Sequence, residues 1–162
     1  MKDLDKNALI AALAAALHEA RERMLAAQRT TAEGVTHADA KSEGDKDMRA
    51  TEASYVARGQ AKRFESLDAD HARVLGFRAK PFAPGAPIAL GALVRLEEEA
   101  GERVVFVAPA GGGTVLALGE ARVHVVTAAS PLGKALLGAR AGDSVLVPRG
   151  GAEDEVTVLA VA

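Results

Sequence analysis

The sequence predicts an α+β protein in which an N-terminal antiparallel helical hairpin precedes a small antiparallel β-sheet domain with one short helix. Apolar residues recur at helical spacing in the first half of the 162-residue chain. Three prolines stand close together near the middle, and short β-branched segments separated by glycines and charged turns follow them. A hydrophobic period that changes from 3.6 to 2 across such prolines marks a change of architecture.

The first predicted helix spans residues 4–29, where nearly every residue is a strong helix former. Its apolar stripe consists of Leu9, Leu13, Leu17, Ala20 and Met24. A stripe this narrow must be buried against another element. The first helix therefore needs a partner of similar length.

The second predicted helix spans residues 48–75 and ends at Gly76. Its stripe consists of Ala53, Val56, Gln60, Phe64, Leu67, His71 and Val74. Matching it in length to the first helix moves its start to about Ala50 and gives a hairpin about 40 Å long. The two stripes bury each other most simply as an antiparallel coiled-coil hairpin with an acidic tip over residues 30–48.

The prolines predict a linker at residues 79–87 between a hairpin domain at 1–78 and a β domain at 88–162. Five or so antiparallel strands are expected in the β domain. The strand-like segments are 88–98, 102–110, 114–129, 143–150 and 154–162. The glycine-rich stretch 111–114 lacks the lysine of a phosphate-binding loop, which favours a hairpin turn there.

A very short helix is predicted at residues 134–137, inside "SPLGKALLGARAGD". Ser130 is a good N-cap, Pro131 suits the first helical position, and Gly138 suits the position after the last turn. The leucines of this helix are expected to cover one face of the sheet. Ser130 has no GxSxG context, so the pattern favours a cap over a nucleophile.

Composition excludes several classes of function. A formal net charge of −2 gives no general attraction to nucleic acid or anionic membranes, and the absence of cysteine excludes disulfides and thiolate metal sites. Asp3 and Asp5 interrupt any positively charged signal region, so we expect a cytoplasmic protein, and a monomer. The four histidines, His18, His37, His71 and His124, are dispersed and form no metal-ligand pattern.

Residues 88–162 closely resemble the C-terminal domain of the bacterial Gre transcript-cleavage factors. The resemblance is carried by "SPLGKALLGARAGDSVLVPRGG", by the final strand "EVTVLAVA" and by "LGALVRLEEEAGERVVFVAPAGGG". It implies an FKBP-like domain that docks on RNA polymerase at the rim of the secondary channel while the hairpin reaches through the channel. The implied partner-binding residues are Ser130, Pro131 and Gly133, with Ala129 where the family often has an acid.

The hairpin tip resembles the family less closely. Family members carry a "GDxxENAEY"-like segment whose acidic pair helps hold a second Mg²⁺ at the polymerase active centre. In "EGDKDMRATEASY" the resemblance implies Asp45 and Glu52 as catalytic and metal-binding residues and Asp47 as a reserve, although direct alignment places Met48 at the second acid. The alternative is a solvated acidic tip in which Ser42 caps the second helix.

The implied function is that of an elongation regulator that binds RNA polymerase and stimulates cleavage of backtracked RNA. The alternative is a non-catalytic regulator that occupies the channel, competes with cleavage factors or modulates initiation. In either case we expect no activity of the protein alone and no membrane contact. Nucleic acid would be met only within the polymerase complex, and the cofactor would be Mg²⁺ shared with the polymerase and no other.

Overall fold

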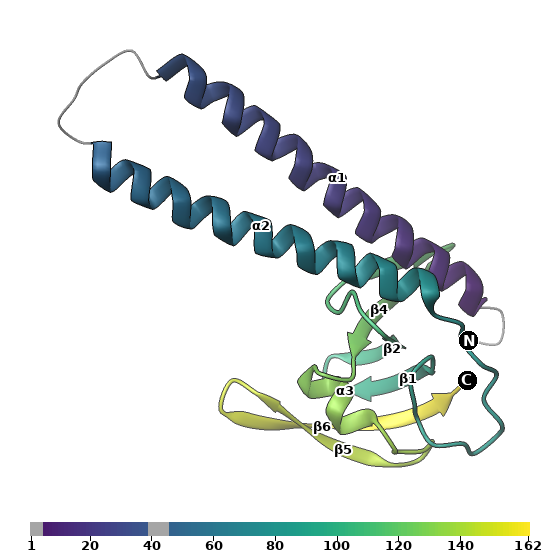
Figure 1. Cartoon of the computed structure of the whole chain (residues 1–162). Helices are drawn as coiled ribbons and strands as arrows, with labels where there is room; N and C mark the ends of the chain where they lie inside the picture. Colours follow the sequence, from purple (N-terminus) through teal and green to yellow (C-terminus); the bar gives the residue numbers. More distant parts are fainter. Residues whose placement is uncertain (1–4, 39–45) are drawn as a thin grey trace.

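The computed structural model describes residues 5–38 and 46–162, with only the backbone described for residues 30–38, 46–54 and 57. Two long helices, α1 (Lys6–Ala38) and α2 (Lys46–Gly76), precede the strand-rich half (Figure 1). That half contains β1 (Leu93–Glu98), β2 (Gly101–Ala108), β3 (Val115–Leu118), β4 (Ala121–Thr127), α3 (Pro131–Leu136), β5 (Ser144–Arg149) and β6 (Ala152–Val161). No helix in the described ranges is long and apolar enough to cross a membrane.

The predicted helical hairpin is confirmed, but its helices are longer than expected. α1 continues through Ala38 instead of ending near Arg29, and α2 begins at Lys46 instead of near residue 48. The threonines and glycine after Arg29 have low helix propensity, but propensity is a weak guide within a long helix. A helix of 33 residues is about 50 Å long, so the hairpin exceeds the predicted length.

The sheet is mixed, which corrects the prediction of an antiparallel sheet. Its six strands lie in the order β3-β4-β2-β1-β6-β5. Four of the neighbouring pairs are antiparallel, but β2 and β4 run parallel, with Val104 opposite Val123 and Ala108 opposite Thr127. After β2 the chain crosses the position that β4 will occupy and forms β3 at the edge of the sheet. The tight β3–β4 turn then places β4 between β3 and β2.

Two local expectations change with this topology. The segment 114–129 contains two strands, β3 and β4, so the sheet has six strands instead of about five. The glycine-rich stretch at 111–114 does contain a turn, but it is not a hairpin turn because β2 and β3 are not neighbours in the sheet.

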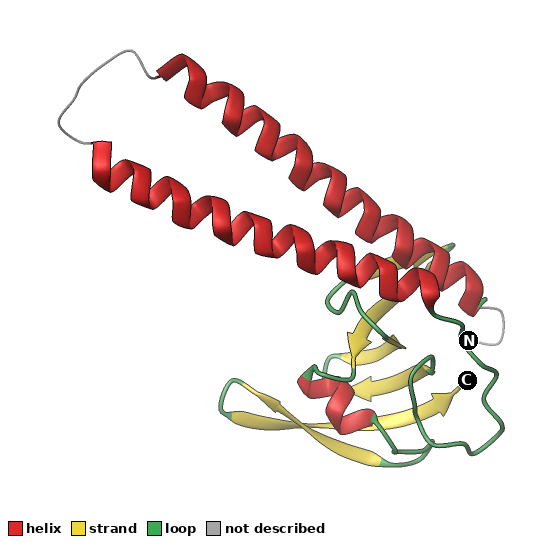
Figure 2. Ribbon diagram, viewed as in Figure 1, coloured by secondary structure: helices red, strands yellow, loops and turns green. Residues whose placement is uncertain are grey.

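The sheet is covered on both faces (Figure 2). One face packs against the lower ends of α1 and α2, and this first core contains Leu9, Ile10, Leu13, Ala14, Leu17, Val74, Leu93, Phe106, Ala108, Ala110, Leu116, Val123 and Val125. The second core contains Leu136 of α3, Ile88, Ala92 and the residues Val94, Leu96, Val105, Val107, Val126, Val147, Val156 and Val158. Alternate residues of β2 enter opposite cores, because successive side chains of a strand point to opposite faces. The hairpin is therefore anchored to the sheet by a common apolar core.

Candidate functional site

The corner between β4 and α3 is built around the side chain of Ser130. Its backbone is extended, and its hydroxyl accepts a hydrogen bond from the backbone N–H of Gly133 at 3.1 Å. The same hydroxyl donates to the backbone carbonyl of Thr127 at 2.8 Å. Pro131 begins the helix. The predicted N-cap and the predicted proline position are both confirmed.

Gly133 allows α3 to pack directly on the end of β4. The residue is buried, and a Cβ atom at this position would lie 1.9 Å from the carbonyl oxygen of Thr127. Since that oxygen belongs to the backbone and already accepts the Ser130 hydrogen bond, it cannot move aside cheaply. Any side chain at position 133 would push α3 away from β4, so Gly133 determines the shape of the corner.

The end of α3 is tied to the segment that leads into the sheet. Gly138 has a φ of 87°, which favours glycine, and its N–H donates to the carbonyl of Ile88 at 2.9 Å. Ile88 in turn donates to the carbonyl of Ala139 at 2.7 Å. Of the helix leucines, Leu136 is buried in the second core, whereas Leu137 remains 39% exposed. The expectation that the leucines cover the sheet is thus met by Leu136 but not by Leu137.

A groove of about 460 Å³ opens beside this corner. Its lining includes the apolar residues Val126, Leu132 and Val147 together with Ser130 and Pro131.

Two arginines also line the groove, and each is held by an acidic partner. Arg149 pairs with Asp154 at 3.1 Å, and Arg103 pairs with Glu98. The groove thus has an apolar lining next to two arginines whose charges are already paired with acids of the same chain.

The predicted tip residues lie largely outside the described structure. Asp45 is outside the described residues, and Asp47 and Glu52 belong to α2 with only their backbone described. A helix turns once in 3.6 residues, so positions 47 and 52 differ by about 140° around the axis. Asp47 and Glu52 therefore lie on different faces of α2 and do not make a natural pair.

The shaft of the hairpin contains polar contacts between its two helices. Arg21 of α1 forms an ion pair with Asp68 of α2 at 3.0 Å, and its guanidinium carbon lies 5.1 Å from the centre of the Phe64 ring. The rings of His18 and His71 lie one turn nearer the sheet, with their centroids 5.8 Å apart. These histidines are far apart in the sequence, and only the antiparallel register of the helices brings them together.

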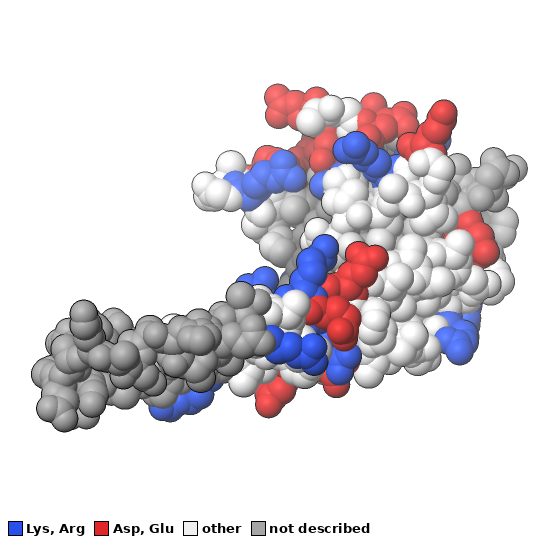
Figure 3. All heavy atoms as spheres, turned by 90° about the horizontal axis from the view of Figure 1, so that it is seen from above, with Lys and Arg blue, Asp and Glu red and all other residues white. Residues whose placement is uncertain are grey.

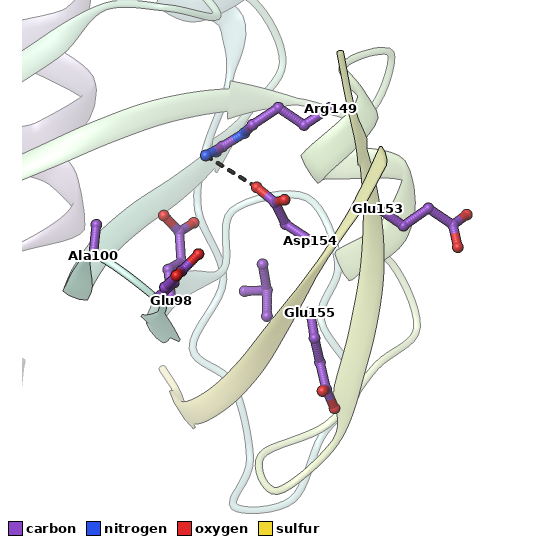
Figure 4. Close-up of a pocket in the computed structure, with 8 residues that line it drawn as sticks. Glu98, Ala100, Arg149, Glu153, Asp154 and Glu155 are labelled. Atoms are coloured by element: carbon purple, nitrogen blue, oxygen red, sulfur yellow. Dashed lines mark ion pairs between the residues drawn. The ribbon is translucent and has the colours of Figure 1, made fainter. Parts of the chain in front are cut away.

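Another hollow lies between the turn that follows β1 and the β5–β6 hairpin. It has a volume of about 640 Å³, and five carboxylate residues and Arg149 line it. Figure 4 shows Asp154 turned toward Arg149 while Glu153 points away from that pair. In Figure 3 acidic side chains gather on one side of the sheet-bearing half, away from the projecting helices. Within the described ranges, no group of three or more potential ligands could hold a metal ion.

Lys6 links the start of α1 to the proline-rich segment. Its ammonium lies 4.4 Å from the centre of the Phe82 ring and donates to the carbonyl of Lys80 at 3.3 Å. Partial burial lowers the pKa of this ammonium group because desolvation disfavours its charged form. Lys6 therefore helps to hold the hairpin against the segment that enters the sheet.

Comparison with known proteins gives one family match and several similar structures. The family described as "Transcription elongation factor, GreA/GreB, C-term" matches residues 84–162. A search of curated proteins finds no significant match.

Three solved structures illustrate the structural similarities. A structure of the transcription factor Gfh1 is 26% identical over 94% of this chain and 92% of its own, with a TM-score of 0.39. GreA factor homolog 1 of Thermus thermophilus is 22% identical over 94% of each chain, with a TM-score of 0.37. A GreA/GreB factor from Nitrosomonas europaea is 22% identical over 60% of this chain and 79% of its own, with a TM-score of 0.36.

The assignment rests on the family match, which covers every strand, the short helix and the Ser130 corner. The resemblance first noted in residues 88–162 is therefore confirmed. Residues 84–162 therefore contain a domain that matches the C-terminal domain of the GreA/GreB transcription elongation factors.

Proposed function

We propose that the protein binds RNA polymerase at the rim of its secondary channel through the corner formed by Ser130, Pro131 and Gly133, with the hairpin directed into the channel. The observation that carries the proposal is that a GreA/GreB C-terminal domain shares one apolar core with a projecting helical hairpin (Figure 1). A shared core lets the docked domain orient the hairpin. Such a role belongs to a cytoplasmic protein whose contact with RNA is made only inside the polymerase complex.

The neighbouring groove supports docking at this corner. It places apolar walls beside Pro131, which is exposed, and it is lined by two arginines. An apolar centre flanked by charge is typical of surfaces that bind another protein. Ala129 is exposed at the same corner and supplies no charge, so we expect weaker binding than an acid at this position would give.

We further propose that Asp45 and Glu52 act at the polymerase active centre, where they help hold Mg²⁺ and position the attacking water. Carboxylate oxygens suit Mg²⁺, which takes one or two of them together with water and phosphate oxygens. The polymerase supplies the remaining ligands and the backtracked RNA. The protein alone then has no nuclease activity.

A cleavage assay on backtracked elongation complexes tests the catalytic proposal. Asp45→Asn and Glu52→Gln remove charge with little change of shape, and each should slow shortening of the RNA by about 100-fold or more while binding is unchanged. Glu33→Gln is the matched control and should cleave at the wild-type rate.

The alternative proposal is a non-catalytic regulator that occupies the channel. It is favoured by the wider spacing of the tip acids relative to the family pattern. If the wild-type protein binds the polymerase but leaves backtracked RNA uncut at every Mg²⁺ concentration, the catalytic proposal is wrong and the occupancy proposal stands.

A binding measurement on folded variants tests the docking site. Ser130→Ala combined with Pro131→Ala should weaken polymerase binding at least tenfold. Loss of the cap costs about 1 kcal/mol of stability, so the circular dichroism of the variant must first match that of the wild type. Val115→Ala, at a residue 51% exposed on β3, is the control that should bind normally. Wild-type affinity in the folded double variant would exclude this corner as the site.

A further inference from the structure

Two imidazole rings from opposite helices meet in the shaft of the hairpin. His18 of α1 and His71 of α2 have ring centroids 5.8 Å apart, and their planes are inclined by 37°. His18 is exposed and His71 is partly buried. The pair is therefore open to solvent on one side, where a small ion has access.

The backbone on both sides of this pair is held by other contacts. One helical turn toward the tip, Arg21 and Asp68 join the same two helices through an ion pair at 3.0 Å. One turn toward the sheet, Val74 is only 1% exposed in the first core, which also contains Leu17. Contacts other than the histidines thus join the two helices on both sides of the pair.

We propose that His18 and His71 form a binding site for a late first-row divalent transition metal ion such as Ni²⁺ or Zn²⁺. Imidazole nitrogen is a preferred ligand for these ions. A metal–nitrogen bond is about 2.0–2.1 Å long, so a centroid separation of 5.8 Å is compatible with one ion bound by both rings.

The remaining ligands of the ion are expected to be water. The described residues contain no group of three or more potential ligands, so within them the two histidines are the ligands we assign to the ion. This differs from a structural zinc site, which has four protein ligands. It also excludes Mg²⁺ as the preferred ion, since Mg²⁺ requires oxygen ligands.

The bound ion would join α1 and α2 between the core at their base and the distal part of the hairpin. A ligand that binds only the folded state stabilises that state. Metal binding should therefore stiffen the hairpin and raise its resistance to unfolding. This inference does not depend on polymerase binding or on cleavage.

Isothermal titration calorimetry on the full chain, without an affinity tag, tests the site with Ni²⁺ as the probe. We expect one Ni²⁺ per chain, and at least tenfold weaker binding in both His18→Gln and His71→Gln. The double variant should bind Ni²⁺ at least as weakly as either single variant, because each single variant still keeps one imidazole that can coordinate the ion. His124→Gln, which removes a histidine of β4, is the matched control and should bind like the wild type.

Thermal unfolding provides a second measurement. Ni²⁺ should raise the midpoint for the wild type and for His124→Gln but not for His18→Gln, once circular dichroism without metal shows that each variant is folded. Retention of wild-type Ni²⁺ affinity by His18→Gln or His71→Gln would overturn the proposal. Absence of any Ni²⁺ binding at millimolar concentration by the wild type would overturn it equally.

Discussion

Gly133 in α3 and Gly59 in α2 are both helical glycines, but their surroundings differ. A Cβ atom on Gly133 would lie 1.9 Å from the carbonyl oxygen of Thr127, whereas nothing lies within 4 Å of a Cβ atom on Gly59. Glycine at position 133 therefore permits close packing. Glycine at position 59 gives only backbone freedom, which the folded helix must lose.

Alanine substitution should consequently have opposite effects at these two positions. Gly133→Ala should lower the free energy of unfolding by about 1–3 kcal/mol or more, because α3 must shift. Gly59→Ala should raise it by about 0.5–1 kcal/mol, because alanine favours the helix. Urea unfolding followed by far-ultraviolet circular dichroism measures both. If both variants changed the free energy of unfolding in the same direction, close packing around Gly133 would not explain the effect of its substitution.

Lys6 makes the stability of the fold depend on pH. Burial holds the folded pKa of its ammonium below the ordinary value of 10.5, so the folded state binds fewer protons than the unfolded state as pH approaches 10.5. The contribution of Lys6 to the free energy of unfolding should therefore increase as the pH rises toward 10.5. The penalty for burying the charge is fully present at neutral pH.

Lys6→Met tests this dependence because it keeps the apolar stem and removes the charge. The stability of the wild type relative to the variant should increase as the pH is raised from neutral toward 10.5. Lys134→Met, at an exposed residue of α3, is the control and should show a smaller pH dependence. A constant difference between the wild type and Lys6→Met would contradict the assigned role of burial.

At the scale of elements, the connections determine what the strand and helix patterns build. The loop between β2 and β3 approaches α1 so closely that a Cβ atom on Gly111 would lie 2.9 Å from Cδ1 of Leu13. This loop carries the chain past β4, and β4 then pairs in parallel with β2. The glycine-rich stretch thus serves close packing against a helix, in addition to making a turn.

At the scale of the whole molecule, the base of the hairpin and one face of the sheet form a single core. Leu13 of α1 is fully buried in the core that also contains Phe106 of β2 and Val123 of β4. Side chains packed this closely respond together to a change of volume. We therefore expect the hairpin base and the sheet to unfold as one unit.

Leu13→Ala tests this coupling. It should lower the free energy of unfolding by about 2–5 kcal/mol, and hydrogen exchange should show faster exchange both in α1 and in β4. Val56 was expected in the buried stripe of the second helix, but it is 58% exposed on α2. Val56→Ala is therefore the control and should change stability by no more than about 0.5 kcal/mol. Increased exchange confined to α1 would show that the hairpin and the sheet are independent units.

The sequence by itself determined the features that depend on local chemistry. Helical periodicity predicted the hairpin and its buried leucines, and the order Ser130, Pro131 and Gly138 predicted the capped short helix, because caps and stops act through the nearest turn of backbone. The family resemblance of the C-terminal half was also readable from contiguous motifs. The roles of Asp45 and Glu52 stay predictions, since Asp45 lies outside the described residues and only the backbone of Glu52 is described.

Only the tertiary structure decided the features that depend on residues distant in the sequence. The parallel pairing of β2 with β4 follows from how a connection crosses the sheet, and the continuation of α1 to Ala38 was not predicted by local propensity. The meeting of His18 with His71 depends on the register of two antiparallel helices. Such contacts are set by packing between elements, and no local spacing encodes them.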